Sequence, residues 1–133
     1  MTVPIGLADT SIFIASEHGR QFDESRLPTE LMISAISIAE LHVGVHAAKD
    51  TETRSRRMAT LSAASALAAL PVDEAVAREW ARMRYRLAEA GRRINVNDLW
   101  IASIAIANSL PVVTQDSEFE VLVGLGGPDV ILL

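Results

Sequence analysis

Val3-Pro-Ile-Gly-Leu-Ala-Asp9 is a short apolar run that ends on a carboxylate, and Leu110-Pro-Val-Val-Thr114 is a second run, followed by Asp116. Continuous apolar runs of this length are typical of strands buried in a parallel sheet. Further strand candidates are residues 31–35, 70–72 and 130–133. Because helical patterns separate these runs, the chain is expected to fold from βαβ units into a mainly parallel sheet.

The helices are predicted from capping residues and from apolar spacing. One begins just after Asp9, and Ser37 and Glu40 match a capping box that opens a helix reaching about Ala48. The remaining helices are predicted over residues 52–69, from a cap at Asp73 to Gly91, from a cap at Asn97 to Asn108, and over 117–122. The segments between them are short, so we expect one domain over residues 1–133.

Composition excludes several classes of site. The 133 residues contain no cysteine, which rules out a thiol nucleophile and a thiolate metal site. Lys49 is the only lysine and lies outside any glycine-rich loop, so a P-loop is excluded. The net charge of −5 argues against general nucleic-acid binding. No apolar stretch is long enough for a membrane span and the first residues carry no charged signal region, so we expect a cytoplasmic protein.

Four acids occupy positions that favour a functional site. Asp9 and Asp116 follow strands, and parallel sheets bind ligands beyond the carboxyl ends of their strands. Asp98 shares a helical stripe with Ile101, and burying an unpaired charge costs more than the ~0.3–1 kcal/mol that a helix dipole returns. Glu40 lies on an apolar helix face. Helix caps or turns remain alternative roles for Asp9, Glu40 and Asp116, while Glu118 and Glu120 are interpreted as peripheral, with Glu120 as a reserve ligand.

If these acids converge, they need a cation. Two carboxylates ~4 Å apart repel by about 4 kcal/mol near a protein surface, and Lys49 cannot neutralise the group. Oxygen ligands without cysteine select Mg²⁺ or Mn²⁺ over Zn²⁺. His42 and His46 have the spacing of a zinc pair, but Val43 stands where the zinc-protease motif needs glutamate. We therefore interpret both histidines as surface residues.

The motifs together resemble the PIN-domain nucleases, and in particular the VapC-type toxins of bacterial toxin–antitoxin pairs. The resemblance extends over nearly the whole chain. It is carried by Leu7-Ala-Asp-Thr-Ser11, Ser34-Ala-Ile-Ser-Ile-Ala-Glu-Leu41 with Gly44, Asn97-Asp-Leu-Trp-Ile-Ala102, and Val113-Thr-Gln-Asp116 before Phe119. Gln115 departs from the arginine or asparagine of many relatives, and Ser103 stands where alanine is frequent; neither change removes an acid.

The resemblance implies a three-layer α/β/α fold over residues 1–133, a single PIN-like nuclease domain with its acids at one end of a parallel sheet. It implies that Asp9 and Asp98 are the most direct metal ligands of a catalytic Mg²⁺ site, with Mn²⁺ as an alternative. Glu40 and Asp116 would complete this site, and Ser11 and Thr114 would orient the acids. It also implies a homodimer, a cognate VapB-type antitoxin, and structured RNA such as tRNA or rRNA as the substrate.

The functional hypothesis is therefore a Mg²⁺-dependent endoribonuclease in which a metal-activated water hydrolyses the phosphodiester bond. Arg54, Arg56 and Arg57 either guide the RNA backbone or form a solvated helix face. Two alternatives remain open on the residues alone: a receiver-like signalling module, which would need a lysine at a late strand end, and a DNA-directed metal nuclease, which would need a larger basic surface.

Overall fold

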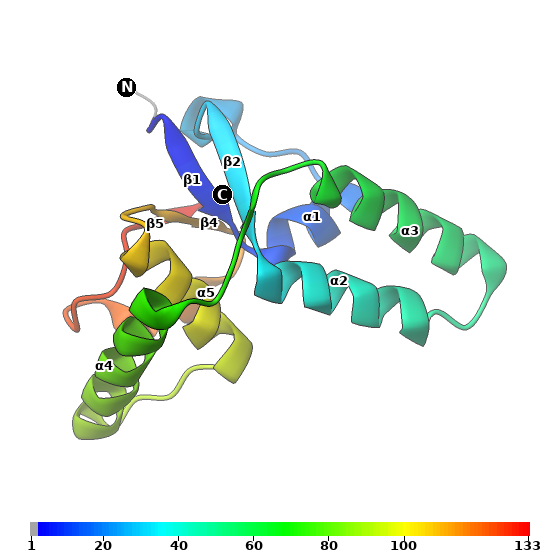
Figure 1. The fold of residues 1–133 in the computed structure, drawn as a ribbon. Helices are drawn as coiled ribbons and strands as arrows, with labels where there is room; N and C mark the ends of the chain where they lie inside the picture. The colour runs from blue at the N-terminus through cyan, green and yellow to red at the C-terminus, as the bar shows by residue number, and fades with distance from the viewer. Residues whose placement is uncertain (1–2) are drawn as a thin grey trace.

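The computed structural model describes residues 3–133, in which five strands form one sheet of order β3-β2-β1-β4-β5 (Figure 1). The strands are β1 Ile5–Ala8, β2 Glu30–Ser34, β3 Ala69–Leu70, β4 Val112–Thr114 and β5 Val130–Leu132. All neighbouring pairs are parallel, as predicted, and Ala8 of the central strand pairs with Ile33 on one side and with Val113 on the other. The first strand therefore lies in the middle of the sheet.

Helices cover both faces of this sheet. They are α1 Thr10–Glu17, α2 Ala35–Ala47, α3 Thr51–Ser65, α4 Glu74–Ala90 and α5 Val96–Ala107, with 3-10 turns η1 Glu24–Arg26 and η2 Ser117–Leu122. Successive strand residues point to opposite faces. Leu7 and Val112 accordingly pack in the main core with α4 and α5, whereas Ala8 and Val113 pack with Ile12 of α1. The three-layer α/β/α arrangement is confirmed.

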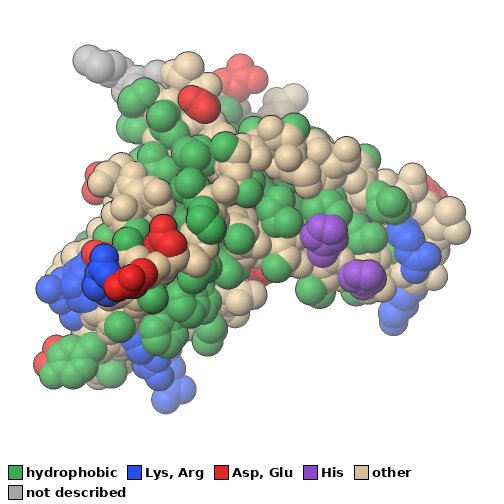
Figure 2. Space-filling model, viewed as in Figure 1, with side chains coloured by type: hydrophobic (Ala, Val, Ile, Leu, Met, Phe, Trp, Pro, Cys, Tyr) green, Lys and Arg blue, Asp and Glu red, His purple; other side chains and the backbone are tan. Residues whose placement is uncertain are grey.

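Helices α2 and α3 form an antiparallel pair that projects from the sheet as an arm (Figure 1). Its base is closed by Ile33, Leu41 and Ala64, which form a small buried cluster of their own. Helix α3 ends at Ser65 rather than at the predicted residue 69. His42 and His46 are exposed on the arm, which agrees with their interpretation as surface residues (Figure 2).

Two predicted helix caps were wrong, and both corrections involve functional candidates. Ser34, not Ser37, caps α2 by accepting a hydrogen bond from the backbone N–H of Ser37 at 3.0 Å. Asn95, not Asn97, caps α5 by accepting from the N–H of Asn97 at 2.8 Å. Each cap satisfies a first-turn donor. The Glu40 side chain is therefore free of the capping role that the Ser37 capping box assigned to it.

Arginines of α4 and of the turn after it hold the segment that follows η2. Arg82 donates to the carbonyl of Gly126 at 3.2 Å and Arg86 to that of Leu125 at 2.8 Å. Arg92 donates to two carbonyls, of Val121 at 3.1 Å and of Val123 at 2.9 Å. These guanidinium groups satisfy carbonyls at the end of a helical turn, where no intrahelical partner exists. They fix η2, which carries acidic residues at its other end.

Among the helices within residues 3–133, none has the length and apolar character that a bilayer crossing requires.

Candidate metal centre

Asp9 lies at the carboxyl end of the central strand and is almost fully buried, with 4% of its surface exposed. The backbone places it there, because the Asp9 N–H donates to the carbonyl of Val113 at 2.8 Å and continues the β1–β4 ladder. The Thr114 hydroxyl donates to Asp9 Oδ2 at 2.9 Å. A buried carboxylate is costly without such a partner, so this bond both satisfies and orients it.

Thr114 and Ser11 join the ends of β1 and β4 in one hydrogen-bond network. Thr114 Oγ1, which donates to Asp9, also accepts from the backbone N–H of Asp116 at 2.9 Å. Ser11 Oγ lies 3.2 Å from Thr114 Oγ1 and accepts from the N–H of Gln115 at 3.0 Å. Thr114 therefore contacts the Asp9 carboxylate and the Asp116 backbone, whereas Ser11 contacts Thr114 and the Gln115 backbone. That these hydroxyl groups orient the acids for catalysis stays a prediction.

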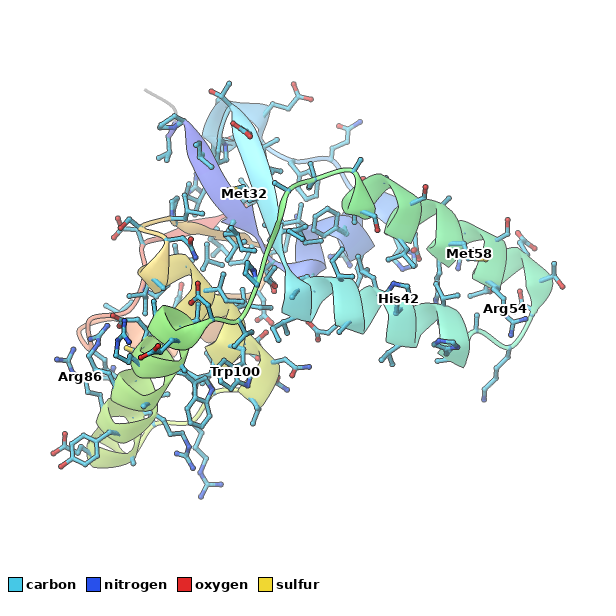
Figure 3. All side chains as sticks on the ribbon, viewed as in Figure 1. Met32, His42, Arg54, Met58, Arg86 and Trp100 are labelled. Carbon is cyan, nitrogen blue, oxygen red and sulfur yellow. The ribbon has the colours of Figure 1, made fainter. Side chains whose placement is uncertain are left out.

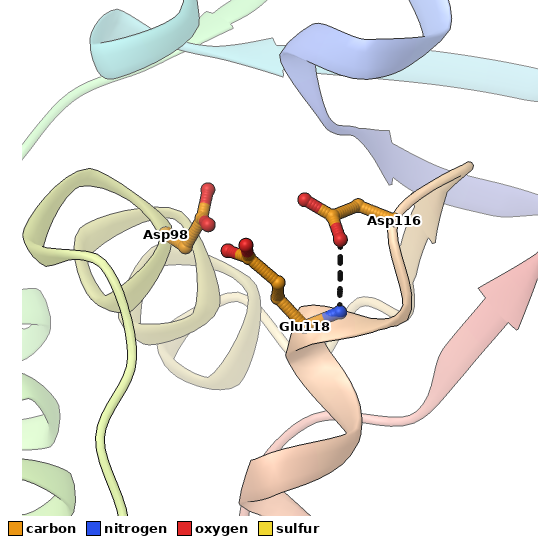
Figure 4. Close-up of side chains that lie close together, drawn as sticks. All are labelled: Asp98, Asp116 and Glu118. Carbon is orange, nitrogen blue, oxygen red and sulfur yellow. Dashed lines mark hydrogen bonds between the residues drawn. The ribbon is translucent and has the colours of Figure 1, made fainter.

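Three carboxylates meet across the gap between α5 and η2 (Figure 4). Asp98, Asp116 and Glu118 each offer an oxygen, and these oxygens all lie within 4.8 Å of one another. Asp98 is in the first turn of α5, while Asp116 Oδ1 caps η2 by accepting from the N–H of Glu118 at 2.9 Å. The structure thus brings together two of the four predicted acids and adds a third carboxylate.

Glu118 is the residue that the sequence interpretation left at the periphery. Its carboxylate belongs to this group, whereas Glu120, the reserve candidate, lines a separate cavity with Asp129. A local signal was available, because an aspartate that caps a turn binds the N–H two residues on. In Asp116-Ser-Glu118 that bond draws the aspartate to the glutamate backbone, but it does not by itself set the direction of the Glu118 carboxylate.

Asp98 shows that the acids influence one another. Its pKa is raised from 3.8 to about 7, first by burial, then by the negative charge of Asp9, and then by a hydrogen bond with Glu118. The charges of Glu118 and Asp116 act in the same direction. Each of these causes favours the protonated form of Asp98 over its carboxylate. Asp9 is therefore part of the same electrostatic cluster, although its oxygens lie outside the group of three.

Glu40 is linked to the end of β1 through Thr10. The Thr10 hydroxyl donates to Glu40 Oε1 at 2.7 Å and lies 2.8 Å from the buried Ser37 hydroxyl. Thr10 directly follows Asp9, so this contact draws α2 towards the end of β1. Glu40 is not among the carboxylates whose oxygens meet within 4.8 Å, and it does not contribute to the raised pKa of Asp98. It borders the cluster.

The three arginines predicted to contact RNA all have partners within the protein. Arg54 donates to the carbonyl of Ala48 at 3.0 Å, and Arg57 donates to that of Gly44 at 2.7 Å. Arg56 forms an ion pair with Glu17 of α1 at 3.5 Å. These contacts hold α3 against α2 and α1. Binding of RNA by these arginines stays a prediction, and the structure supplies each with an architectural role.

The donor set fits a hard divalent cation. All the converging ligands are carboxylate oxygens, and none of the ion pairs formed by residues 3–133 involves Asp9, Asp98, Asp116 or Glu118. Acids held together without a cationic side chain are stabilised by a metal ion or by protonation, and the raised pKa of Asp98 is the signature of the second case. Carboxylates of this kind suit Mg²⁺ or Mn²⁺ better than Zn²⁺.

Comparison with known proteins agrees with this geometry. The PIN domain family matches residues 7–125. The chain is 48% identical to Ribonuclease VapC5 of Mycobacterium tuberculosis over 130 residues, 98% of this chain and 96% of that protein. It is 38% identical to Ribonuclease VapC4 of the same organism over 120 residues, 90% of this chain and 92% of that one.

A solved structure gives the same answer for the fold. The crystal structure of VapBC-5, a member of the VapBC family of toxin–antitoxin systems from Mycobacterium tuberculosis, superposes with a TM-score of 0.90 at 45% identity. The match covers 97% of this chain and 98% of that chain. Fold and sequence agree, and the chain belongs to the PIN-domain family, among the VapC ribonucleases.

Proposed function

We propose that this chain is a Mg²⁺-dependent endoribonuclease and the toxin of a toxin–antitoxin pair, with Asp9, Glu40, Asp98, Asp116 and Glu118 as its acidic site. The observation that carries the proposal is the meeting of Asp98, Asp116 and Glu118 within 4.8 Å beside the buried Asp9. Family membership supplies the class of reaction, and the acids supply the place where it occurs. Mn²⁺ is the alternative cation.

Each side chain has a definite task in this proposal. Asp98, Asp116 and Glu118 hold the cation, and Thr114 keeps the Asp9 carboxylate facing them. Thr10 holds Glu40 at the border of the site, where it orients the attacking water. The cation, when bound, neutralises the scissile phosphate and lowers the pKa of water. Asp98 must lose its own proton before it can hold a cation, so cation affinity rises as pH increases through about 7.

The expected products carry a 5′-phosphate and a 3′-hydroxyl, because water rather than the ribose hydroxyl attacks. Structured RNA, such as tRNA or rRNA, is the proposed substrate. Arg54, Arg56 and Arg57 are proposed to contact its backbone. The proposed setting is the cytoplasm, with a cognate VapB-type antitoxin and a homodimer of the single domain over residues 1–133. The solved VapBC-5 structure, described as part of a toxin–antitoxin system, supports the antitoxin partner.

Cleavage by purified variants tests the site. We expect Asp9→Asn and Asp98→Asn each to abolish Mg²⁺-dependent RNA cleavage while circular dichroism stays unchanged. Glu52→Gln removes a charge from an exposed position on the arm and is the matched control, with full activity expected. Cleavage at the wild-type rate by both aspartate variants would remove the proposed mechanism.

Parallel assays address the remaining alternatives. RNA should be cut and branched DNA of matching length should not, which separates the proposal from a DNA-directed nuclease. A receiver-like module would need a lysine at the acidic edge, but Lys49 is exposed in the loop between α2 and α3. Sedimentation velocity tests the homodimer, and a monomer at every concentration would contradict it.

A further inference from the structure

A large cavity lies between α4 and the start of α5, apart from the acidic cluster. Its volume is about 580 Å³. The residues that carry the argument are Trp80, Arg84 and Leu87 of α4, Arg93 in the connecting turn, and Leu99 of α5. The apolar members form a wall, and the arginines stand at its rim. A concave site with an apolar wall and few charged groups is the usual form of a small-ligand pocket.

The charge of this cavity is opposite to that of the chain. Three arginines and no acid line it, although the net charge of the protein is −5. Arg92, one of the three, already donates to carbonyls of the segment after η2. Arg84 and Arg93 are exposed, and the guanidinium group of neither takes part in a side-chain hydrogen bond or ion pair found within residues 3–133. These two cations are available to an anionic ligand.

The wall offers an aromatic surface as well. Trp80 stacks on Trp100, with ring centroids 4.9 Å apart and planes inclined by 20°, and Figure 3 shows Trp100 between α4 and α5. The indole N–H of Trp80 is buried without a hydrogen-bond partner. An aromatic platform next to cationic side chains is the combination that binds single-stranded nucleic acid, because bases stack on the ring while phosphates pair with the charges.

The cavity adjoins the acidic cluster through α5. Leu99 lines the cavity and Asp98, the preceding residue, belongs to the group of converging carboxylates. Adjacent residues on a helix point in different directions, so the two sites lie on different sides of the first turn of α5. An RNA strand held at the acids can therefore reach the cavity with a neighbouring nucleotide.

We propose that this cavity binds one nucleotide of a single-stranded RNA segment next to the cleavage position, with its base against Trp80 and its phosphates at Arg84 and Arg93. The inference rests on the proposed ribonuclease function and adds a subsite to it. Loops of structured RNA provide such unpaired bases. Selection of the cleavage site then depends on the nucleotide that fits this cavity as well as on the acids.

Tryptophan fluorescence tests the subsite directly, because Trp80 and Trp100 are the only tryptophans in the chain. A short single-stranded RNA of mixed sequence is titrated into the full-length protein in a chelator, so that binding occurs without cleavage. We expect saturable quenching for the wild type. Arg84→Ala/Arg93→Ala should weaken binding about tenfold and lower the slope of log affinity against log salt by about 1.4, the value for two lost phosphate contacts on a single strand.

Arg26→Ala/Arg78→Ala is the matched control, since it removes the same charge from exposed positions outside the cavity. It should bind RNA with wild-type affinity. Equal RNA affinity of the two double variants would overturn the subsite. A shift from dimer to monomer caused by Arg84→Ala/Arg93→Ala alone would also overturn it, because the cavity would then belong to an interface between copies. Cavity-dependent binding by a wild-type protein that cleaves no RNA would support the subsite and refute the proposed nuclease function.

Discussion

Replacing Asp98 by asparagine should stabilise the metal-free protein while it destroys activity. In the folded chain the pKa of Asp98 is about 7, against an ordinary 3.8, because burial and the charge of Asp9 disfavour the carboxylate. A pKa difference of that size corresponds to an upper limit of about 4 kcal/mol at a pH above both values. Asp98 is only half-buried, so solvent screening reduces the expected effect to about 1–2 kcal/mol.

The sign of this effect depends on pH. Between pH 3.8 and pH 7 the folded protein binds a proton at Asp98 that the unfolded chain has lost, so the stability of the wild type falls as pH rises through this window. The asparagine side chain of the variant does not titrate. The free energies of unfolding of the two proteins should therefore be similar near pH 4, and the variant should be more stable by about 1–2 kcal/mol at pH 8.

Urea unfolding in a chelator at pH 4.5 and pH 8, read by circular dichroism at about 25 °C, measures the difference. Addition of Mg²⁺ at pH 8 should reverse the order, because a ligand that binds only the folded state stabilises the wild type and not the variant. An Asp98→Asn protein that is no more stable than the wild type at pH 8 without metal would refute the reasoning, since it would mean that burial and the neighbouring acids do not disfavour the Asp98 carboxylate.

Three further changes separate the roles of neighbouring residues. Glu118→Gln should weaken Mg²⁺ binding about tenfold, as measured by calorimetry. It should also lower the pKa of Asp98, so the acid limb of the pH–rate profile in cleavage assays moves to lower pH. Glu120→Gln should change neither the Mg²⁺ affinity nor the pH–rate profile. Gly126→Ala should lower the free energy of unfolding by about 1 kcal/mol more than Gly124→Ala in urea unfolding. Both glycines have φ of +81°, but only at position 126 does a Cβ meet the guanidinium groups of Arg82 and Arg86, which must move and weaken their hydrogen bonds to the carbonyls of Gly126 and Leu125. Thr114→Val should lower the free energy of unfolding by about 1–3 kcal/mol, because Asp9 and the N–H of Asp116 both lose their hydrogen-bond partner. It should also reduce kcat. A purely structural role of Thr114 would leave kcat unchanged.

Much of the fold could be predicted from the sequence because its strands are buried on both faces. The apolar runs before Asp9 and Asp116 are typical of strands buried in a parallel sheet. Parallel pairing of these strands then places both acids at the edge formed by their carboxyl ends. Strand order was not accessible in this way. The central place of β1 depends on contacts between distant segments, which local patterns do not encode.

The helix caps and Glu118 show where local patterns become ambiguous. Ser34 and Ser37 both precede an apolar run, as do Asn95 and Asn97, and capping is decided by the backbone angles of one residue in each pair. Glu118 has the appearance of any exposed acid in a turn. Only the approach of α5, which is set by packing in the core, gives its carboxylate a partner.

The arginines of α4 illustrate the same limit for charge patterns. Their clustering in the sequence is equally compatible with nucleic-acid binding and with a structural role. Arg82 and Arg86 bind backbone carbonyls 44 and 39 residues away, whereas Arg84 lies on the cavity side and has no partner among residues 3–133. Which arginines are available to a ligand follows from the fold and not from their spacing.

The central position of β1 has a consequence for the chain while it is being synthesised. Asp9 precedes its hydrogen-bond partner Thr114 by 105 residues, and Asp116 and Glu118 come later still. Until translation has passed these positions, the growing polypeptide has one flank of its middle strand unpaired and only part of its set of acids. The acidic site is therefore incomplete in any nascent chain whose synthesis has not yet passed Glu118.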